Sequence, residues 1–232
     1  GSITVICSDK TGTLTRNEMV VEKIFADGKL FEVTGTGYEP KGEFLFEGKK
    51  IDAGKEKGLL KLLEIGAECN DASLDAEKNE FKIIGDPTEG CLTVVGLKAS
   101  LKKGAKRVDE IPFESERKMM TTVHEIGGKK IAYSKGALEK ILSISDFIFE
   151  GGKISKFSEN RKKQILTQGE GLAKEAYRLL GFSFKEAGQK EKLEEKMVFA
   201  GFVAMRAPVR EGVKEAIEST KRAGIKVKII PG

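Results

Sequence analysis

Residues 3–15 of the chain read ITVICSDKTGTLT, and the interpretation of the whole sequence starts from them. The apolar run 3–7 is typical of a buried strand in a parallel sheet. Asp9 follows this strand at its carboxyl end, where open α/β sheets place their chemistry. A carboxylate there can attack a phosphoryl group and form an aspartyl-phosphate, and Lys10, Thr11 and nearby backbone N–H groups are suited to hold phosphate oxygens. A plain polar loop is the alternative, but the complete heptapeptide 9–15 after an apolar strand favours a site for phosphoryl chemistry.

The composition is that of an ordinary soluble protein, with 232 residues, 39% hydrophobic and 33% charged. No run approaches the roughly 18 apolar residues of a membrane span, and no signal peptide is visible, since Gly1-Ser2 resembles a cloning remnant. The three cysteines, Cys7, Cys69 and Cys91, show no metal-binding spacing and suit a reducing compartment. The net charge of +5 weakly favours an anionic ligand. Without a clustered basic stripe, nucleic acid is not an expected partner.

The middle of the chain, from residue 22 to 197, differs from both ends. Turn residues between short alternating runs predict antiparallel hairpins at Asp27-Gly28, Gly48, Gly127-Gly128 and Gly151-Gly152. Helical patterns interrupt the strands at residues 57–68, 88–101 and 159–176. We therefore expect an α+β domain built on an antiparallel sheet.

Residues 198–232 return to the parallel pattern. The run 198–203 predicts a strand, 211–223 an amphipathic helix ending near Gly224, and 225–230 a second strand. This βαβ unit should cross over right-handed and join the strand before Asp9. The predicted fold class is therefore α/β, with the antiparallel-sheet α+β domain (22–197) inserted into a partial Rossmann-like domain formed by residues 1–21 and 198–232.

The glycine pair at 127–128 predicts the register of its hairpin. If the two glycines form a two-residue turn, Met120 faces Lys135, and Lys118 is the diagonal neighbour of Lys135, roughly 7–8 Å away. Two like charges so placed repel unless both are solvated or an anion lies between them, and a triphosphate would satisfy both. Phe113, just upstream, suits either stacking on an adenine ring or ordinary core packing.

Residues 6–15, with Asn17 and Met19 after them, resemble the phosphorylation motif of P-type ATPases, which belong to the haloacid-dehalogenase superfamily. The resemblance implies that Asp9 accepts the γ-phosphate of ATP, that Lys10 and Thr11 are catalytic, and that Asp9 and Thr11 help to bind Mg²⁺. Phosphatase relatives carry a general acid/base Asp where this chain has Thr11. A Thr hydroxyl is a poor base near neutral pH, so the phosphoenzyme should persist, as a pump requires.

The same resemblance assigns nucleotide-binding residues in the middle of the chain. Phe113 matches a Phe that stacks on adenine, Lys118 a Lys near the nucleotide, and Lys135, in Lys135-Gly136-Ala137, a Lys that lines the pocket. Glu89, in the stretch DPTE at 86–89, matches a Glu that approaches the adenine. That stretch is equally an ordinary helix start, with Asp86 as N-cap and Pro87 at the first helical position.

Two arginines complete the set of site residues that the resemblance implies. Arg178 matches an Arg that reaches the phosphates. Arg210 matches the Arg of an Asp-Pro-Pro-Arg-like hinge of the family, in which Ala207 stands here in place of the Asp. Pro231 replaces a Thr that contacts the phosphate, and the family's later Lys and the Asp pair that hold Mg²⁺ are absent from these 232 residues. We therefore expect this chain to bind ATP without turning it over.

The function that the resemblance implies is that of a cation-transporting P-type ATPase. The chain would be its nucleotide-binding domain (22–197) with parts of the phosphorylation domain, on the cytoplasmic side of an integral membrane protein. Its partners would be ATP and the remaining phosphorylation, actuator and transmembrane domains. His124 is followed by Glu125 and not by the Pro of heavy-metal pumps, which favours calcium, sodium or proton pumps or lipid flippases, and we expect it on the sheet surface. A lipid flippase and a soluble haloacid-dehalogenase-type phosphatase are the alternatives.

Overall fold

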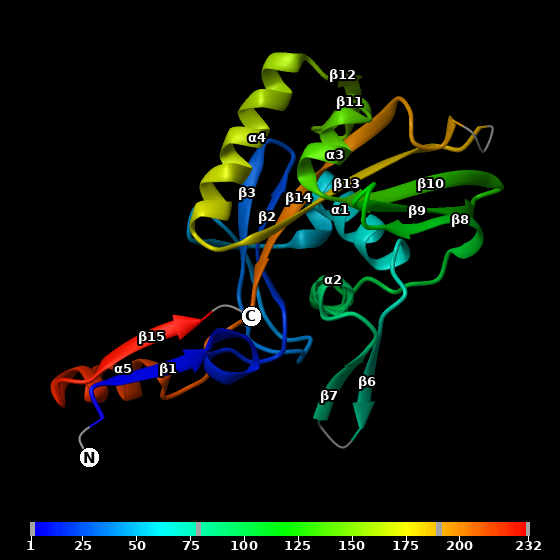
Figure 1. The fold of residues 1–232 in the computed structure, drawn as a ribbon. Helices are drawn as coiled ribbons and strands as arrows, with labels where there is room; N and C mark the ends of the chain where they lie inside the picture. The colour runs from blue at the N-terminus through cyan, green and yellow to red at the C-terminus, as the bar shows by residue number, and fades with distance from the viewer. Residues whose placement is uncertain (1–2, 78–79, 189–191, 231–232) are drawn as a thin grey trace.

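The computed structural model describes residues 3–77, 80–188 and 192–230. They form a large part, residues 20–206, which we call the body, and a smaller one, residues 3–15 and 208–230, which we call the terminal unit (Figure 1). The two parts are joined where β2 enters the body and where β14 leaves it. The described residues contain no helix that is both long and apolar enough to cross a membrane.

The body is built on one large and mainly antiparallel sheet. In the described part of the chain its main path runs β5-β4-β3-β2-β14-β13-β10-β9-β8, and β11 pairs in parallel with β14 and carries β12 at its other edge. The bounds are β2 Val20–Ala26, β3 Lys29–Val33, β4 Phe44–Phe46, β5 Lys49–Ile51, β8 Lys106–Glu114, β9 Met119–Ile126, β10 Lys129–Gly136, β11 Ser145–Glu150, β12 Lys153–Lys156, β13 Arg178–Glu186 and β14 Met197–Arg206.

All four predicted hairpins are confirmed. They join β2 to β3, β4 to β5, β9 to β10 and β11 to β12. In each of them both turn residues have positive φ, for example 57° and 78° at Gly127 and Gly128. Type I′ turns require this geometry, and it matches the right-handed twist of the strands. The predicted register is also confirmed, since Met120 pairs with Lys135.

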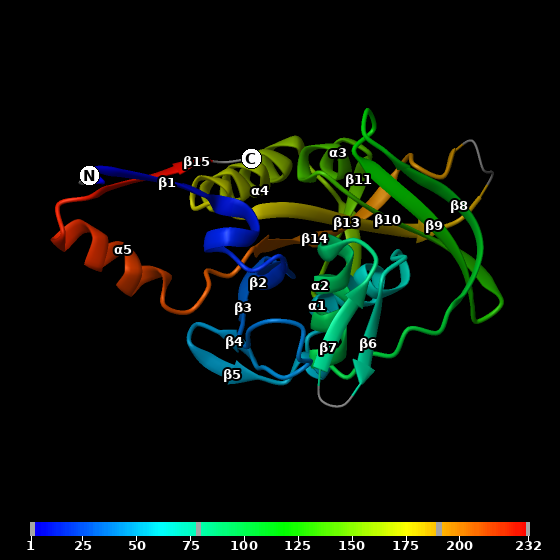
Figure 2. The same ribbon diagram turned by 60° about the horizontal axis from the view of Figure 1, so that its bottom comes forward.

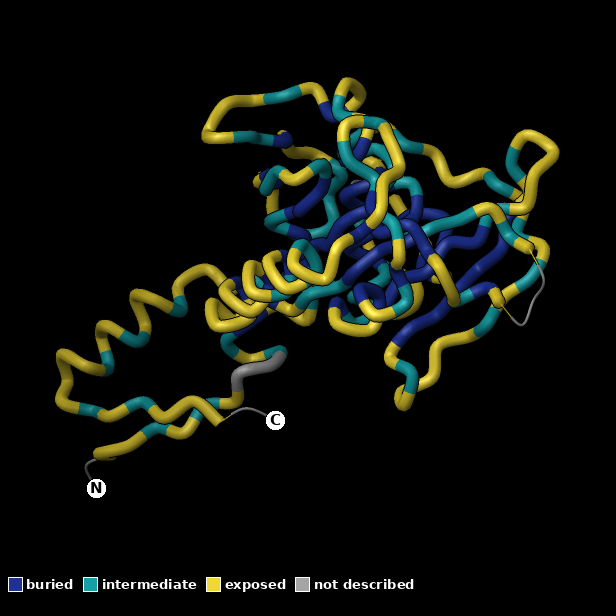
Figure 3. Tube along the Cα trace, turned by 90° about the horizontal axis from the view of Figure 1, so that it is seen from above, coloured by how far each residue is buried: buried dark blue, intermediate teal, exposed yellow. Residues whose placement is uncertain are grey.

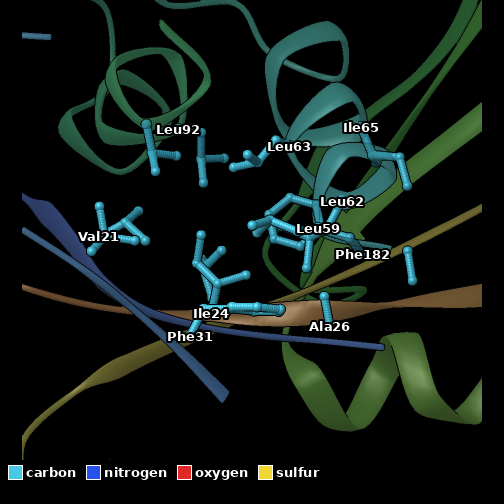
Figure 4. Close-up of a cluster of buried hydrophobic side chains, with 14 of the residues drawn as sticks. Val21, Ile24, Ala26, Phe31, Leu59, Leu62, Leu63, Ile65, Leu92 and Phe182 are labelled. Atoms are coloured by element: carbon cyan, nitrogen blue, oxygen red, sulfur yellow. The ribbon is translucent and has the colours of Figure 1, made fainter. Parts of the chain in front are cut away.

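Helices cover both faces of this sheet (Figures 1 and 2). Helices α1 (Lys57–Glu68) and α2 (Pro87–Lys98) pack on one face, and α3 (Leu138–Ser143) and α4 (Glu159–Lys174) on the other. Successive strand residues point to opposite faces, so Ile24 joins the cluster under α1 whereas Phe25 joins the cluster under α3 and α4. Figure 4 shows the first cluster, in which Leu59, Leu62 and Leu63 of α1 lie on the same side of the sheet as Leu92 of α2. The body is therefore a three-layer arrangement.

Two smaller elements complete the body. A short 3₁₀ turn, η2 (Ala53–Lys55), precedes α1. Strands β6 (Ser73–Glu77) and β7 (Glu80–Ile84) form a separate two-stranded sheet that projects beside α2 (Figure 1). The sequence patterns did not predict this pair.

Strand β14 corrects one expectation. Residues 198–203 were expected in the parallel unit with Asp9, but β14 pairs antiparallel with β13 and β2 in the large sheet. Nine of its ten residues are buried, because α1 lies over one face and α3 over the other. A continuous apolar run fits any strand that is covered on both faces, so the pattern does not distinguish a parallel sheet from this central antiparallel position.

The terminal unit holds the parallel part of the prediction. Strand β1 (Val5–Asp9) pairs in parallel with β15 (Lys226–Ile230), from Val5 opposite Lys226 to Asp9 opposite Ile230. A single π-helical turn, η1 (Lys10–Leu14), follows β1, and α5 (Val213–Arg222) precedes β15. The helix and the parallel pairing of 225–230 with the strand before Asp9 are therefore confirmed. Figure 3 shows that most of this unit is exposed or half-buried.

Candidate functional site

A buried ion pair lies at the centre of the candidate site. Lys135 of β10 and Glu89 in the first turn of α2 are 46 residues apart in the sequence, yet Lys135 Nζ is 2.5 Å from Glu89 Oε1. The two side chains are only 7% and 17% exposed. Lys135 Nζ also donates a hydrogen bond to the Cys69 carbonyl. Charge-assisted hydrogen bonds of this kind are short and strong, so the pair holds β10, α2 and the end of α1 together.

The turn after α1 fixes the position of Glu89. Asn70 is fully buried, and its amide donates hydrogen bonds to the carbonyl of Glu89 (2.9 Å) and to that of Gly66 (3.0 Å). The N–H of Asp71 donates to Glu89 Oε2 at 3.0 Å. Both carboxylate oxygens of Glu89 are thus bound, one by Lys135 and one by backbone. Asn70 could not be recognised from the sequence, because a single Asn after a helix is a common cap residue.

The expected helix start at 86–89 is confirmed. The carboxylate of Asp86 accepts hydrogen bonds from the backbone N–H groups of Thr88 (2.7 Å) and Glu89 (3.3 Å), and Pro87 occupies the first turn. Arg178, at the start of β13, donates from Nη1 to Thr88 Oγ1 at 3.0 Å. The structure therefore brings the guanidinium of Arg178 to the residue next to Glu89.

Phe113, Lys118 and Gly136 lie at the same end of the three neighbouring strands β8, β9 and β10. Glu114 pairs with Met119, and Met119 pairs with Gly136, so Phe113 lies two strands, or about 10 Å, from Gly136. Phe113 is 60% exposed, which leaves an aromatic side chain open to a ligand. Gly136 permits a close backbone approach, because a Cβ there would lie 2.6 Å from the Lys118 carbonyl oxygen and 2.5 Å from Met119 Cβ.

Lys118, expected as the diagonal neighbour of Lys135 in this hairpin, has different surroundings from Lys135 in the structure. It lies in the β8–β9 turn with φ of 55°, just outside strand β9, and its carbonyl accepts a hydrogen bond from Ala137 N at 2.9 Å. Its side chain is 60% exposed, with Nζ 4.0 Å from Glu139 Oε1. Since Lys135 is buried against Glu89, the two lysines have separate acidic neighbours, and no anion is needed to relieve their repulsion.

His124 corrects another expectation. It is 1% exposed and not on the sheet surface, because the end of α1 and the segment before β8 cover this part of β9. Its Nε2 lies 2.8 Å from Thr122 Oγ1, and its Nδ1 lies 3.8 Å from Glu68 Oε2. Burial lowers the pKa of His124. Burial has the opposite effect on the Cys69 thiol and raises its pKa, although the charge of nearby Lys135 opposes this shift. Cys69 is therefore a packed side chain and not a reactive thiol.

Asp9 and Arg210 lie in the terminal unit, on the other side of the molecule from β8–β10 (Figure 1). Asp9 is the last residue of β1 and is exposed. Arg210 Nη2 donates to the Gly12 carbonyl at 2.7 Å and Nε to the Thr15 carbonyl at 3.3 Å, so this arginine braces the turn after Asp9. The side chains of Lys10 and Thr11, and residue Pro231, lie outside the part that the structure describes.

The described residues do not make up a magnesium site by themselves. Within residues 3–77, 80–188 and 192–230, no group of three or more His, Cys, Asp or Glu side chains is placed to hold a metal ion. Mg²⁺ prefers six oxygen ligands, including carboxylates and phosphates, and Asp9 offers one carboxylate.

Comparison with known proteins matches residues 58–212 to the family profile described as P-type ATPase, cytoplasmic domain N. The calcium-transporting ATPase of Bacillus subtilis is 34% identical, in an alignment that covers 100% of this chain and 27% of that protein. The cation-transporting ATPase pma1 of Synechocystis is 36% identical, with 100% and 27% covered. The human calcium-transporting ATPase type 2C member 1 is 33% identical, with 100% and 25% covered. The chain thus spans about a quarter of the length of these relatives.

Proposed function

The chain belongs to the P-type ATPase family, in the region described as cytoplasmic domain N, and on that premise we propose that its body is an ATP-binding domain. The observation that carries this proposal is the buried Glu89–Lys135 pair, held between β10 and α2, in the same sheet that exposes Phe113 on β8, two strands from β10. A carboxylate, an aromatic ring and outlying cations are the groups that adenine and a triphosphate require.

Each group has a distinct part in the proposed complex. Phe113 stacks on the adenine ring, and Glu89, fixed by Asn70 and Asp71, accepts from the exocyclic amine of adenine. Lys118 and Arg178 supply positive charge for the phosphates. Lys135 holds Glu89 in place, and Gly136 allows the Lys118 turn to lie against β10. A guanine base presents an acceptor where adenine has a donor, so the site should prefer ATP to GTP.

A direct binding measurement tests the proposal. ATP titrated into the 232-residue chain by calorimetry should give saturable binding that Phe113→Ala weakens by about 1–3 kcal/mol, the value typical of base–aromatic stacking. Ile154→Ala is the matched control, because Ile154 of β12 is also an exposed apolar residue, at 54%. Equal affinities for Phe113→Ala, Ile154→Ala and the unmodified chain would contradict the proposed site.

For the whole protein we propose a cation pump that forms an aspartyl-phosphate at Asp9. The relatives' printed names, calcium-transporting and cation-transporting ATPases, support cations over lipids as cargo and a pump over a soluble phosphatase. On this proposal the body is inserted into a haloacid-dehalogenase-like phosphorylation domain, to which the terminal unit contributes. The chain lies on the cytoplasmic side of the membrane, and the rest of that domain, the actuator domain and the membrane helices are its partners.

Phosphorylation of the full-length protein tests this part. Asp9→Asn keeps the size of the side chain but removes the nucleophile, so labelling with γ-labelled ATP should disappear while ATP binding remains. Persistent labelling of the Asp9→Asn variant would assign the nucleophile to another residue. The 232-residue chain itself should bind ATP without hydrolysing it, because in-line transfer needs positioned cations around the phosphoryl group as well as the attacking oxygen.

A further inference from the structure

Arg117 ties together both strands of the turn that carries Phe113 and Lys118. Its Nη2 donates to the carbonyl of Pro112 at 2.9 Å, on β8, and to that of Met119 at 3.2 Å, on β9. Its Nε donates to Glu114 Oε2 at 3.1 Å. The guanidinium is a rigid fork with fixed donor directions, so its position sets the separation of the two strands beside Phe113.

Glu194 in turn holds Arg117. Its Oε2 lies 2.5 Å from Arg117 Nη1, and the side chains of Arg117 and Glu194 are only 27% and 20% exposed. Its Oε1 accepts a hydrogen bond at 2.7 Å from the buried hydroxyl of Thr121, which itself lies 2.7 Å from Ser134 Oγ on β10. A carboxylate that is bound on both oxygens and partly buried has one position available to it, so it transmits that position to Arg117.

The segment that carries Glu194 is itself anchored to the sheet. Leu193 is 2% exposed and packs against Val123 and Ala132. Lys185 of β13 donates hydrogen bonds to the carbonyls of Lys192 and Glu195. The next residue, Glu195, is exposed. Glu194 is therefore presented from a fixed stretch of backbone, residues 192–195, just before β14.

We propose that Glu194 is a positioning residue of the nucleotide site, which acts through Arg117 to fix the backbone beside Phe113. It does not contact the nucleotide. The inference rests on the proposed ATP-binding function, and it adds that residues 192–195, just before β14, control the affinity for adenine. Arg117 binds the carbonyl of Pro112, the residue before Phe113. A change at Glu194 should therefore alter the stacking of Phe113 on adenine, and it should change the affinities for adenosine and ATP by the same factor.

The test is a double-mutant cycle on the 232-residue chain, with binding of ATP and adenosine measured by calorimetry. Glu194→Gln keeps an acceptor for Thr121 but removes the charge opposite Arg117. We expect Glu194→Gln to lower the affinities for ATP and adenosine by the same factor, roughly three- to tenfold, which is the usual size of the coupling between residues in contact. The control Glu195→Gln makes the same charge change one residue away and should leave both affinities unchanged. In a Phe113→Ala background, Glu194→Gln should have no further effect.

The outcomes separate the inference from the function that underlies it. If the unmodified chain binds ATP and Phe113→Ala weakens it, but Glu194→Gln binds as tightly as Glu195→Gln, the inference is overturned and the proposed function stands. An equal loss for Glu194→Gln with and without Phe113 also overturns it, because the residue would then act by another route. Absence of ATP binding by the unmodified chain overturns both. Arg117→Lys keeps the positive charge opposite Glu194 but removes the planar guanidinium that binds both strands. It should lower the affinity for ATP and adenosine as much as Glu194→Gln does, although a charge pair with Glu194 is retained.

Discussion

The body and the terminal unit follow similar apolar patterns but differ in how those patterns are covered. In the body, β14 is buried at nine of ten positions and helices lie on both of its faces. In the terminal unit, α5 has no buried residue, and β1 alternates between exposed and half-buried positions. Large apolar side chains are exposed there at Ile3, Val5, Val209, Ile229 and Ile230. An apolar pattern thus indicates that a segment is suited to burial, but it does not indicate which part of a protein buries it.

This difference predicts where the stability of the chain resides. Leu62 of α1 is 1% exposed in the core under the large sheet, and Leu62→Ala should cost about 3–4 kcal/mol of unfolding free energy through lost burial and a cavity. Ile217→Ala, on α5, should cost less than about 1 kcal/mol, because this residue is only half-buried. Urea unfolding followed by far-ultraviolet circular dichroism measures both. Similar losses for the two variants would remove the distinction between the parts.

Breaking an ion pair should also cost more unfolding free energy in the body than in the terminal unit. Lys135→Met leaves Glu89 charged, largely buried and unpaired, and should cost about 2–4 kcal/mol of unfolding free energy. Arg16→Met removes the partner of Glu211, which lies in the terminal unit; Arg16 Nη2 is 3.9 Å from Glu211 Oε1, and the two side chains are 43% and 96% exposed. It should change stability by at most about 0.5 kcal/mol. Glu89→Gln added to Lys135→Met should restore part of the loss, and a double variant less stable than Lys135→Met would show that the charge pair is not the cause.

A smaller effect should appear with pH, and only in the body, because His124 is the single histidine of the chain. Burial lowers its pKa below the ordinary 6.5, the Ala105 carbonyl and Glu68 oppose this shift, and Arg107 and Lys103 add to it. The unfolded chain therefore takes up this proton more readily than the folded chain. Stability should be highest above pH 6.5 and should fall as the pH drops through the lowered pKa of His124.

The pH effect is isolated by comparison with His124→Gln. Unfolding free energies measured in urea between pH 7.5 and 5.5 should decline more for the unmodified chain than for this variant, since glutamine does not titrate. Parallel pH profiles for the two proteins would mean that His124 contributes nothing to the dependence.

The smallest effect is expected at Asp9. Within the 232-residue chain, Asp9→Asn should leave the affinity for ATP within about twofold and the unfolding free energy within about 0.5 kcal/mol, because Asp9 is exposed at the end of β1 and away from β8–β10. Calorimetry and urea unfolding measure these values. A tenfold loss of affinity would mean that the terminal unit takes part in binding the nucleotide to this chain.

The parts of the fold that could be predicted from sequence are those that depend on local chemistry. The glycines of the four hairpins require positive φ, and Asp86-Pro87 starts a helix on capping grounds alone. The position of β14 could not be predicted, because its apolar run has the same appearance in a parallel sheet and in a central antiparallel position. The burial of His124 was missed for a related reason, since it depends on where the end of α1 packs.

The candidate site divides in the same way. Glu89, Phe113 and Lys135 could be named from motifs, but the pairing of Glu89 with Lys135 depends on two segments 46 residues apart and on the Asn70 turn that holds Glu89. Arg117 and Glu194 are 77 residues apart, and no local pattern connects them. Residue types indicated which groups could act, whereas the tertiary packing determined which of them meet.

Hydrogen exchange with and without ATP tests the central claim most directly, namely that the body holds the nucleotide and the terminal unit does not. Mass spectrometry of the 232-residue chain should show slower exchange with ATP in peptides that cover residues 86–90, 112–120, 133–137 and 177–180. Exchange in residues 5–15 and 208–230 should stay unchanged. Protection confined to residues 9–15 and 208–212, or no protection at saturating ATP, would contradict the account.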